Sequence, residues 1–339
     1  MTLSAEAIGD AAAALSRGRR FWLTTHVKSD GDGIGCELAL ARALRAMGRE
    51  VRVINDTKVP CSLKFLLSGD DEIAVYEPGA DDGFLAGADT IVVLDVGVVC
   101  RLGRLEEAFR SSGAVKVCLD HHRECGSGFD HVLSDVSIGS TGEILFPLLE
   151  AMGWTWTRDT ATPLFAAISI DTGSFAYERC TPQTFRMAGA LVEAGAEPYA
   201  IHKHLHWHRR LDEIQLEGEV FRSLRIEASG AVAYSEISRH MLDRFKVDPM
   251  ELPTVVNIPL AVEGVEVALL FVESDPCHVN VSARSKGRFG VNALAKRFGG
   301  GGHPLAAGFC LDGPLEEVKA KVLREARELL GMRSVCASP

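Results

Sequence analysis

The stretch that decides the fold is Phe21-Trp22-Leu23-Thr24-Thr25-His26-Val27-Lys28-Ser29-Asp30-Gly31-Asp32-Gly33-Ile34-Gly35. Its first five residues form an apolar and β-branched run that predicts a buried strand. Three side chains of the kind that bind metal ions, His26, Asp30 and Asp32, follow this strand directly. Ligand-type residues directly after a buried strand are typical of α/β proteins, whose sites lie at the carboxyl edge of a parallel sheet.

Apolar runs and helical patterns alternate through the first half of the chain. Strands are predicted at residues 21–25, 51–54, 91–94 and 115–119. Helices are predicted at residues 37–47, 142–152 and 161–170, and a further one between Thr181-Pro182 and Gly195. Continuous β-branched runs between helices favour a mainly parallel sheet that is covered by helices on both faces.

The pattern changes after about residue 197, which indicates a second, smaller α/β domain. Residues 199–220 are polar and periodic, and we expect one connecting helix there. Beyond it we expect a hairpin at 224–237 around Ser229-Gly230, strands at 265–272 and 279–282, and helices at 291–298 and 316–330. The expected division is therefore a catalytic domain at 1–200, a connecting helix or linker at 201–222, and a substrate-binding domain at 223–339.

Composition and charge narrow the class of protein. Hydrophobic residues make up 47% and charged residues 24%, which is the balance of a globular chain with a sizeable core. No apolar run reaches the roughly 18–20 residues of a membrane span, residues 1–10 do not resemble a signal peptide, and the nine cysteines contain no Cys-x-x-Cys pair. We therefore expect a cytoplasmic protein with reduced thiols and no membrane association.

The charge balance argues against long nucleic acids as partners. Lysine and arginine total 36 and aspartate and glutamate 46, so the formal net charge is 36 − 46 = −10. A surface that follows a long duplex needs clustered lysine and arginine, which this balance does not favour. A short anionic substrate remains compatible, provided that metal ions or a few arginines hold it.

Four groups of oxygen and nitrogen ligands occur where we expect strands to end. Besides the first group, Asp95 follows the strand at 91–94, Asp120-His121-His122 follow the strand at 115–119, and Asp171 follows an apolar stretch at 164–170. Strand ends of a parallel sheet share one edge, so we expect these groups to converge. Carboxylates with imidazoles suit Mn²⁺ or Mg²⁺, and two ions roughly 3.5–4 Å apart, bridged by a carboxylate, are typical of phosphate-ester hydrolysis.

Each group alone has an ordinary structural explanation. Asp-Gly-Asp is common in turns, a lone aspartate such as Asp95 often caps a helix, and histidine pairs occur on surfaces. A calcium-binding EF-hand loop that begins at Asp30 is excluded, because Ile34 and Ala41 stand where oxygen ligands are required. The recurrence of all four groups therefore carries the prediction of a metal site.

The motifs resemble those of the DHH phosphoesterase superfamily, which takes its name from an Asp-His-His triplet. The matching segments are His26 to Gly35, Val93-Leu94-Asp95-Val96-Gly97, Asp120-His121-His122, Asp171 to Phe175, Asn280 to Ser285, and Gly299 to Phe309. Their order and the chain length resemble the nanoRNase branch, oligoribonucleases that can also act as 3′-phosphoadenosine 5′-phosphate (pAp) phosphatases. Two departures are Cys36, where serine is usual, and Lys28-Ser29, where Asn-Pro is common.

The resemblance implies two divalent ions, most often Mn²⁺, with Mg²⁺ or Co²⁺ as alternatives. It implies that His26, Asp30 and Asp95 hold one ion. It assigns Asp32, Asp95, His121 and Asp171 to the other, so that Asp95 bridges the two. His122 would face the scissile phosphate, and Asp120 would fix a ring nitrogen of a neighbouring histidine.

The C-terminal half resembles the DHH-associated substrate domain. Arg284 offers a planar fork for a phosphate, and the glycine run allows close backbone approach with free N–H groups. The residues expected to bind substrate are Asn280, Ser282, Arg284, Gly300, Gly301, Gly302 and His303. A further histidine-rich segment, residues 202–208, is interpreted as a solvated helix and not as a metal site, because its histidine pairs face different sides.

The function that follows is hydrolysis of short oligoribonucleotides, from dinucleotides to pentanucleotides, to mononucleotides, and also of pAp to AMP. The expected partners are short single-stranded RNA, dinucleotides and pAp, and a homodimer is expected from the resemblance. Two alternatives stay open at this point. One is a phosphodiesterase for cyclic or linear dinucleotides, and the other is a nucleotide-binding module without catalytic activity.

Overall fold

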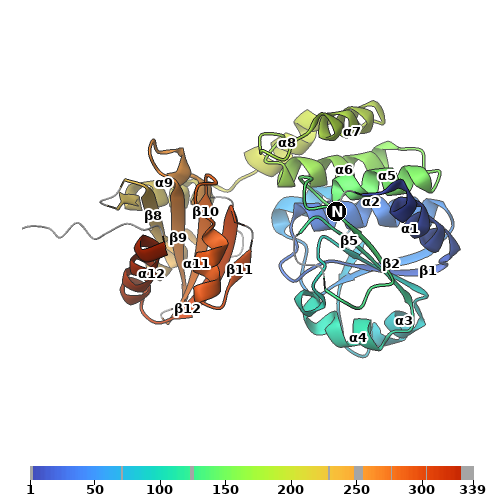
Figure 1. Cartoon of the computed structure of the whole chain (residues 1–339), viewed down its shortest axis with the longest axis horizontal. Coiled ribbons are helices and arrows are strands. Elements are labelled where there is room, and N and C mark those ends of the chain that lie inside the picture. The colour runs from blue at the N-terminus through green and yellow to red at the C-terminus, as the bar shows by residue number, and fades with distance from the viewer. Residues whose placement is uncertain are drawn as a thin grey trace, which may run out of the picture. The chain divides into compact units, whose positions relative to one another are not determined.

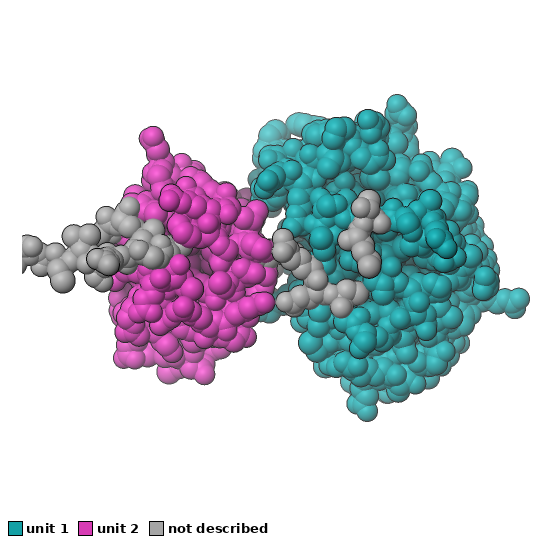
Figure 2. Space-filling model, viewed as in Figure 1, with its two compact units in different colours: residues 1–208 teal, residues 209–339 magenta. Residues whose placement is uncertain are grey.

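The chain folds into two compact units, residues 1–208 and 209–339, which are coloured separately in Figure 2. The structure is a computed structural model that describes residues 3–69, 72–122, 126–227, 230–247, 255–275, 277–302 and 304–329. Within these ranges, none of the helices has the length and apolar character needed to cross a membrane.

The first unit is built on a parallel sheet of six strands in the order β3-β2-β1-β4-β5-β6. The strands are β1 (Arg20–Thr24), β2 (Glu50–Asn55), β3 (Ile73–Val75), β4 (Thr90–Leu94), β5 (Val115–Asp120) and β6 (His131–Ser134). This sheet confirms the mainly parallel α/β fold. The strand order reverses between β1 and β4, and such switch points are where open parallel sheets leave room for a ligand.

Helices cover both faces of this sheet, as Figure 1 shows. The helices of the unit are α1 (Ala5–Arg17), α2 (Gly31–Ala46), α3 (Asp82–Gly87), α4 (Glu106–Ser111), α5 (Gly142–Ala151), α6 (Arg158–Asp171), α7 (Pro182–Glu193), α8 (Pro198–Trp207) and the 3₁₀ helices η1 (Cys61–Leu66) and η2 (Val99–Leu105). Alternation along β1 divides the core: Phe21 and Leu23 pack on the side of α1, α2, α5 and α6, and Trp22 packs on the side of α3, η2 and α4. The apolar central residues of β1 are therefore buried on both faces of the sheet.

Helix α2 begins earlier than the sequence pattern indicated, at Gly31 instead of Glu37. Asp30 is its N-cap, and the Oδ1 atom of Asp30 accepts hydrogen bonds from the backbone N–H groups of Asp32 (3.1 Å) and Gly33 (3.4 Å). A capping aspartate satisfies N–H groups that a helix leaves free, so the Asp-Gly-Asp segment starts the helix instead of forming a turn before it. Asp32 consequently lies in the first turn of α2.

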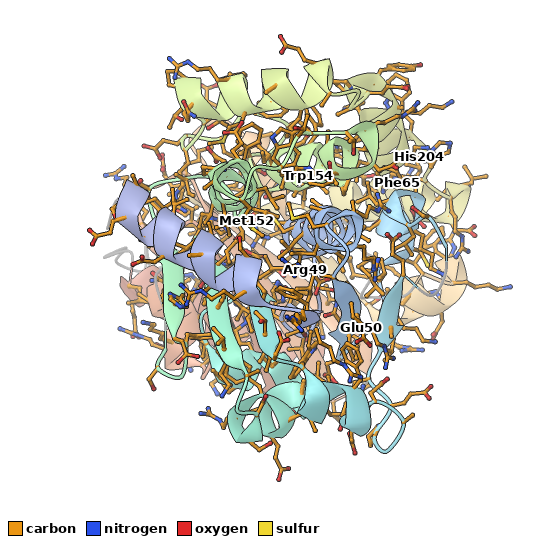
Figure 3. The ribbon with its side chains drawn as sticks, turned by 90° about the vertical axis from the view of Figure 1, so that its right-hand side faces the viewer. Arg49, Glu50, Phe65, Met152, Trp154 and His204 are labelled. Carbon is orange, nitrogen blue, oxygen red and sulfur yellow. The ribbon has the colours of Figure 1, made fainter. Side chains whose placement is uncertain are left out.

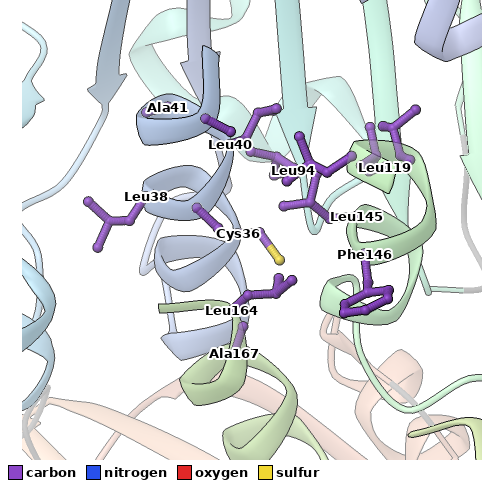
Figure 4. Packing of buried hydrophobic residues seen from close by; sticks show 14 of the residues in the cluster. Cys36, Leu38, Leu40, Ala41, Leu94, Leu119, Leu145, Phe146, Leu164 and Ala167 are labelled. Atoms are coloured by element: carbon purple, nitrogen blue, oxygen red, sulfur yellow. The ribbon is translucent and has the colours of Figure 1, made fainter. Parts of the chain in front are cut away.

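Helices α2 and α6 pack against each other at very close range, in the buried cluster shown in Figure 4. A Cβ atom on Gly31 would lie 2.1 Å from the Cδ1 atom of Ile170, and one on Gly35 would lie 2.4 Å from the carbonyl oxygen of Pro163. Both positions therefore need glycine for the helices to approach. The contacts run antiparallel, so the start of α2 lies beside the end of α6.

The expected single helix at 199–220 is wrong, because two helices occupy this segment. Helix α8 ends at Trp207, and α9 begins at Leu211 in the second unit. Helix α8 belongs to the first unit through Ile201 and through the His204 ring, which stacks on Phe65 of η1 with centroids 4.5 Å apart and an angle of 6° between the rings (Figure 3). The stacked His204 ring therefore attaches α8 to η1.

The second unit has a mixed sheet in the order β11-β12-β10-β9-β8-β7. Its strands are β7 (Arg225–Ile226), β8 (Val232–Ile237), β9 (Val267–Asp275), β10 (His278–Ser285), β11 (Gly301–Gly302) and β12 (Ala306–Asp312). Its helices are α9 (Leu211–Ser223), α10 (Arg239–Phe245), α11 (Val291–Arg297), α12 (Leu315–Leu329) and the 3₁₀ helices η4 (Val255–Asn257) and η5 (Pro259–Ala261). The antiparallel pair β7–β8 confirms the expected hairpin, although Ser229 lies outside the described residues.

We expect Gly35→Ala to destabilise the first unit by about 1–3 kcal/mol, because the added methyl group meets backbone atoms of α6 that cannot move away cheaply. Chemical denaturation of the full chain measures this loss. Gly9→Ala in α1 is the matched control, since nothing lies within 4 Å of its added Cβ atom, and alanine there should be neutral or stabilising. Equal stability of the two variants would contradict the close α2–α6 contact.

Candidate metal centre

The predicted ligand side chains come together at the carboxyl edge of the first sheet. His26 follows β1, Asp95 follows β4, Asp120 is the last residue of β5, and His121 comes directly after it. Strands β1 and β4 are neighbours at the point where the strand order reverses. The convergence expected from the sequence is therefore observed at the switch point of the sheet.

Asp171 reaches the cluster by a different route from the one expected. It is the last residue of α6 and does not follow a strand. Because α6 runs antiparallel to α2, the end of α6 lies beside Asp32 in the first turn of α2. The statement that all four ligand groups sit at strand ends is thus corrected for Asp171, which a helix–helix contact places.

Three overlapping groups of side chains are close enough to hold cations. His26, Asp30 and Asp95 form one group, and Asp32, His121 and Asp171 form another, with the ligand atoms of each within 4.8 Å of one another. A third group, Asp95, His121 and His122, joins the first two. The Oδ2 atom of Asp95 lies 3.5 Å from Nε2 of His26, and its Oδ1 atom lies 3.5 Å from Nε2 of His121. Asp95 therefore stands between the two imidazoles.

Hydrogen bonds orient the histidines of the cluster. The Nδ1 atom of His26 lies 2.8 Å from the carbonyl oxygen of Val27, which leaves its Nε2 atom toward Asp95 and Asp30. The Nδ1 atom of His122 lies 2.6 Å from Oδ1 of Asp120. Such a contact on one ring nitrogen leaves the other ring nitrogen available to a metal ion or a substrate.

The residues that hold the carboxylates in place were not predicted from the sequence. The backbone N–H groups of Thr141 and Gly142 donate to Asp32 at 2.6 and 3.2 Å, and the Thr141 hydroxyl donates to Oδ1 of Asp95 at 3.0 Å. These groups come from the start of α5. A helix start offers free N–H groups to anions, so a Ser-Thr-Gly sequence before an apolar helix was an available signal.

Residues with unfavourable backbone conformations lie at or near the ligand residues in the sequence. Four non-glycine residues of this unit have positive φ angles among those that the structure describes: Lys28 (60°), Asp95 (62°), Ser174 (57°) and Phe175 (66°). All four lie at Asp95 itself or close in sequence to His26 or Asp171. A left-handed residue costs roughly 1–2 kcal/mol, and such strain is characteristic of functional sites.

Protonated histidines compensate the negative charge of the aspartates in the cluster. Burial opposes ionisation of Asp95, but the surrounding histidines hold its pKa at about 2. Burial lowers the pKa of His26 and His121, yet their carboxylate neighbours outweigh it and raise these pKa values to about 9 and about 10. Burial and the charges of Asp95 and Asp171 raise the pKa of Asp32 well above its usual range. The cluster thus favours protons at positions where cations would also be favourable.

The donor set fits divalent cations. The Oδ2 atom of Asp95 is buried and accepts no hydrogen bond of ordinary geometry from the part of the chain that the structure describes. An uncompensated buried carboxylate oxygen is costly, and a cation would satisfy it. Oxygen and imidazole ligands together suit Mn²⁺ or Mg²⁺. Cys36 adds only a weak contact, from Sγ to Oδ1 of Asp32 at 3.5 Å, and burial keeps its pKa well above the usual range.

In the second unit, the expected substrate residues of β10 share one face. Asn280, Ser282 and Arg284 alternate with the buried residues of this strand. Arg284 donates to the carbonyl oxygen of Ala283 at 3.0 Å, and Asn280 accepts a contact from the thiol of Cys310 at 2.8 Å. These three side chains therefore form a row on the less buried face of β10.

Glycines of the run at 299–302 take part in packing. The expectation that their N–H groups are free is wrong for Gly299 and Gly300. Gly299 and Gly300 donate their N–H groups to carbonyl oxygens of α11, at 3.2 and 2.9 Å. A Cβ atom on Gly300 would lie 2.3 Å from the carbonyl oxygen of Gly308, so glycine is required there for strand packing. Gly301 is exposed with open space around it, and Gly302 pairs with Ala307 of β12. His303 lies outside the described residues.

Comparison with known proteins agrees with both units. Residues 20–168 match the DHH family, N-terminal domain, and residues 229–332 match the DHHA1 domain. The bifunctional oligoribonuclease and PAP phosphatase NrnA of Thermus thermophilus is 30% identical over 315 residues, which cover 91% of this chain and 90% of that protein. The chain therefore belongs to the DHH family, as the resemblance of its motifs indicated.

Solved structures show the same fold. An exopolyphosphatase-related protein from Bacteroides fragilis superposes with a TM-score of 0.91 and 26% identity, over 96% of this chain and 97% of that chain. RecJ from Thermus thermophilus, crystallised in complex with Mn²⁺, superposes with a TM-score of 0.53 and 17% identity, over 97% of this chain and 55% of that chain. The RecJ likeness shows a shared fold.

We expect Asp95→Asn to weaken Mn²⁺ binding by at least about 100-fold, because one carboxylate that is shared by two ligand groups loses its charge. Asparagine tolerates the positive φ angle of this position, so the fold should be preserved. Isothermal titration calorimetry measures the affinity and the number of ions. Asp10→Asn, on the exposed surface of α1, removes the same charge and should leave binding unchanged; a variant at position 95 that binds normally would refute the bridging role.

We expect Mn²⁺ binding to release protons between pH 6 and pH 8 and to strengthen as the pH rises. His26 and His121, with pKa values of about 9 and about 10, are protonated in this range and must lose their protons to become ligands. Each released proton increases the apparent affinity by about tenfold per pH unit. Calorimetry in buffers of different ionisation enthalpy counts the protons, and binding without proton release would place the metal elsewhere.

Proposed function

We propose that this protein is a metal-dependent phosphoesterase that hydrolyses short oligoribonucleotides to mononucleotides and dephosphorylates pAp to AMP. The observation that carries the proposal is the cluster of six ligand side chains at the switch point of the first sheet. It is made of His26, Asp30, Asp32, Asp95, His121 and Asp171. The name of the Thermus thermophilus relative supports the choice of substrates.

We assign two divalent ions to this cluster. His26, Asp30 and Asp95 would hold one ion, and Asp32, Asp95, His121 and Asp171 the other, in line with the ligand groups described above. When bound, such ions activate water and stabilise the charge on a scissile phosphate. Mn²⁺ is the preferred ion because of the mixed carboxylate and imidazole ligands, and Mg²⁺ or Co²⁺ are alternatives.

We assign to His122 the role of moving a proton during the reaction. Asp120 accepts from its Nδ1 atom at 2.6 Å, which fixes the orientation of the ring. Its Nε2 atom is then the one that can donate a proton to the leaving oxygen of the substrate. Asp120 is itself completely buried and acts through His122.

The remainder of the nucleotide is assigned to the second unit. Arg284 supplies a guanidinium fork for a phosphate, and Ser282 and Asn280 on the same face of β10 supply polar contacts. Gly301 at the edge strand leaves room for a ligand, whereas Gly300 and Gly302 support it by their close packing on β12. Short substrates agree with a net charge of −10, which disfavours long nucleic acids.

The test is release of AMP by the purified full chain with Mn²⁺, from 5′-labelled diadenylate and from pAp. We expect turnover of both, loss of turnover with a metal chelator, and at least about 100-fold lower kcat in Asp95→Asn. Turnover of cyclic dinucleotides alone would assign a different phosphodiesterase activity. No turnover of diadenylate, pAp or cyclic dinucleotide would contradict the proposal and favour a binding module.

A further inference from the structure

Two exposed cationic side chains border the metal centre and are used by neither the ligand cluster nor the fold. Lys28 lies in the loop between His26 and Asp30, and Arg101 lies in η2 after β4. Both side chains are exposed. Neither makes an ion pair or a side-chain hydrogen bond with any residue in the described part of the chain. We call this pair the cationic rim.

Neighbouring arginines behave differently. Arg104, three residues after Arg101, pairs with Asp56 at 2.5 Å and also donates to the Asp56 carbonyl oxygen. Arg52 pairs with Asp81 at 2.6 Å. The two rim cations lie beside an aspartate cluster and still pair with none of its carboxylates. Their charges are therefore available to an anionic ligand.

The backbone fixes the two members of the rim relative to each other. The N–H group of Val27 donates to the carbonyl oxygen of Arg101 at 2.8 Å. Gly103, with a φ angle of 62°, brings η2 so close that an added Cβ atom would lie 2.6 Å from Cγ1 of Val27. The loop that carries Lys28 and the segment that carries Arg101 are thus joined as one rigid edge.

Two further observations connect the rim with the site. Lys28 has a φ angle of 60°, a conformation that costs a lysine roughly 1–2 kcal/mol and is typical of functional positions. Val27, whose N–H group binds the Arg101 carbonyl oxygen, lies in the chain between the proposed ligand His26 and Lys28. The rim therefore lies on the side of the cluster where His26 and Asp30 are.

We propose that Lys28 and Arg101 bind a second, non-scissile phosphate of the substrate, namely the 5′-phosphate of pAp or of a 5′-phosphorylated dinucleotide. An arginine fork and a lysine point charge are the two side chains that proteins use most for phosphate. The ligand cluster would bind the scissile phosphate. The neighbouring pair of cationic side chains is then suited to bind the phosphate that stays on the product. This inference rests on the proposed function and adds a preference for 5′-phosphorylated substrates.

The test compares substrates with and without the 5′-phosphate: pApA against ApA, and pAp against 3′-AMP. We expect the wild-type chain to favour the phosphorylated member of each pair in kcat/KM. Lys28→Asn and Arg101→Gln should each reduce that preference by about tenfold, mainly through KM, because each removes a charge-assisted contact to phosphate. Asparagine also tolerates the positive φ angle at position 28.

Controls separate the rim from general effects. Lys58→Asn removes an exposed lysine of the same unit, and it should leave the preference unchanged. Arg101→Lys keeps the charge without the fork, and it should retain part of the preference. Melting temperature and Mn²⁺ stoichiometry of each variant show whether the fold and the metal centre persist.

Each outcome decides between the two proposals. Equal losses for ApA and pApA in the rim variants, or a wild-type chain that does not distinguish them, would overturn the phosphate subsite and leave the proposed function standing. No turnover of any of the four substrates by the wild-type chain would instead reject the proposed function. A lowered preference in the rim variants with normal Mn²⁺ binding supports the subsite.

Discussion

Electrostatic repulsion among five aspartates at one sheet edge is the constraint on which the first unit depends. Asp30, Asp32, Asp95, Asp120 and Asp171 could not share this space without compensating positive charge. In the absence of metal, the neighbouring imidazoles keep their protons and provide part of that charge. Divalent ions would replace those protons, so the same crowding that costs stability gives the site its affinity for cations.

Contacts from several elements of the surrounding fold hold these carboxylates in position. The start of α5 supplies N–H groups to Asp32 and a hydroxyl to Asp95, and the close contact of α2 with α6 brings Asp171 to the same place. The positive φ angle of Asp95 is maintained by these supports. Since the first unit contains the whole ligand cluster, we assign the chemistry to it, and we assign recognition of the nucleotide to the second unit and to the cationic rim.

The sequence predicts the parallel sheet and the convergence of the ligand groups because strand ends of such a sheet share one edge. It does not predict how Asp171 arrives, since that depends on a helix contact permitted by Gly31 and Gly35. The contacts of Thr141 with the carboxylates were not predicted, because a threonine near the start of a helix is usually an ordinary helix cap. The break between α8 and α9 was missed because both halves are amphipathic, and periodicity alone cannot locate a break within such a pattern.

The central claim is that two cations share the Asp95 carboxylate at the switch point of the sheet. Anomalous diffraction from crystals of the protein grown with Mn²⁺, collected at the manganese edge, tests this most directly. The account predicts two anomalous peaks, one bordered by His26 and Asp30 and the other by Asp32 and His121, with Asp95 between them. A single peak, or peaks away from these side chains, would contradict it.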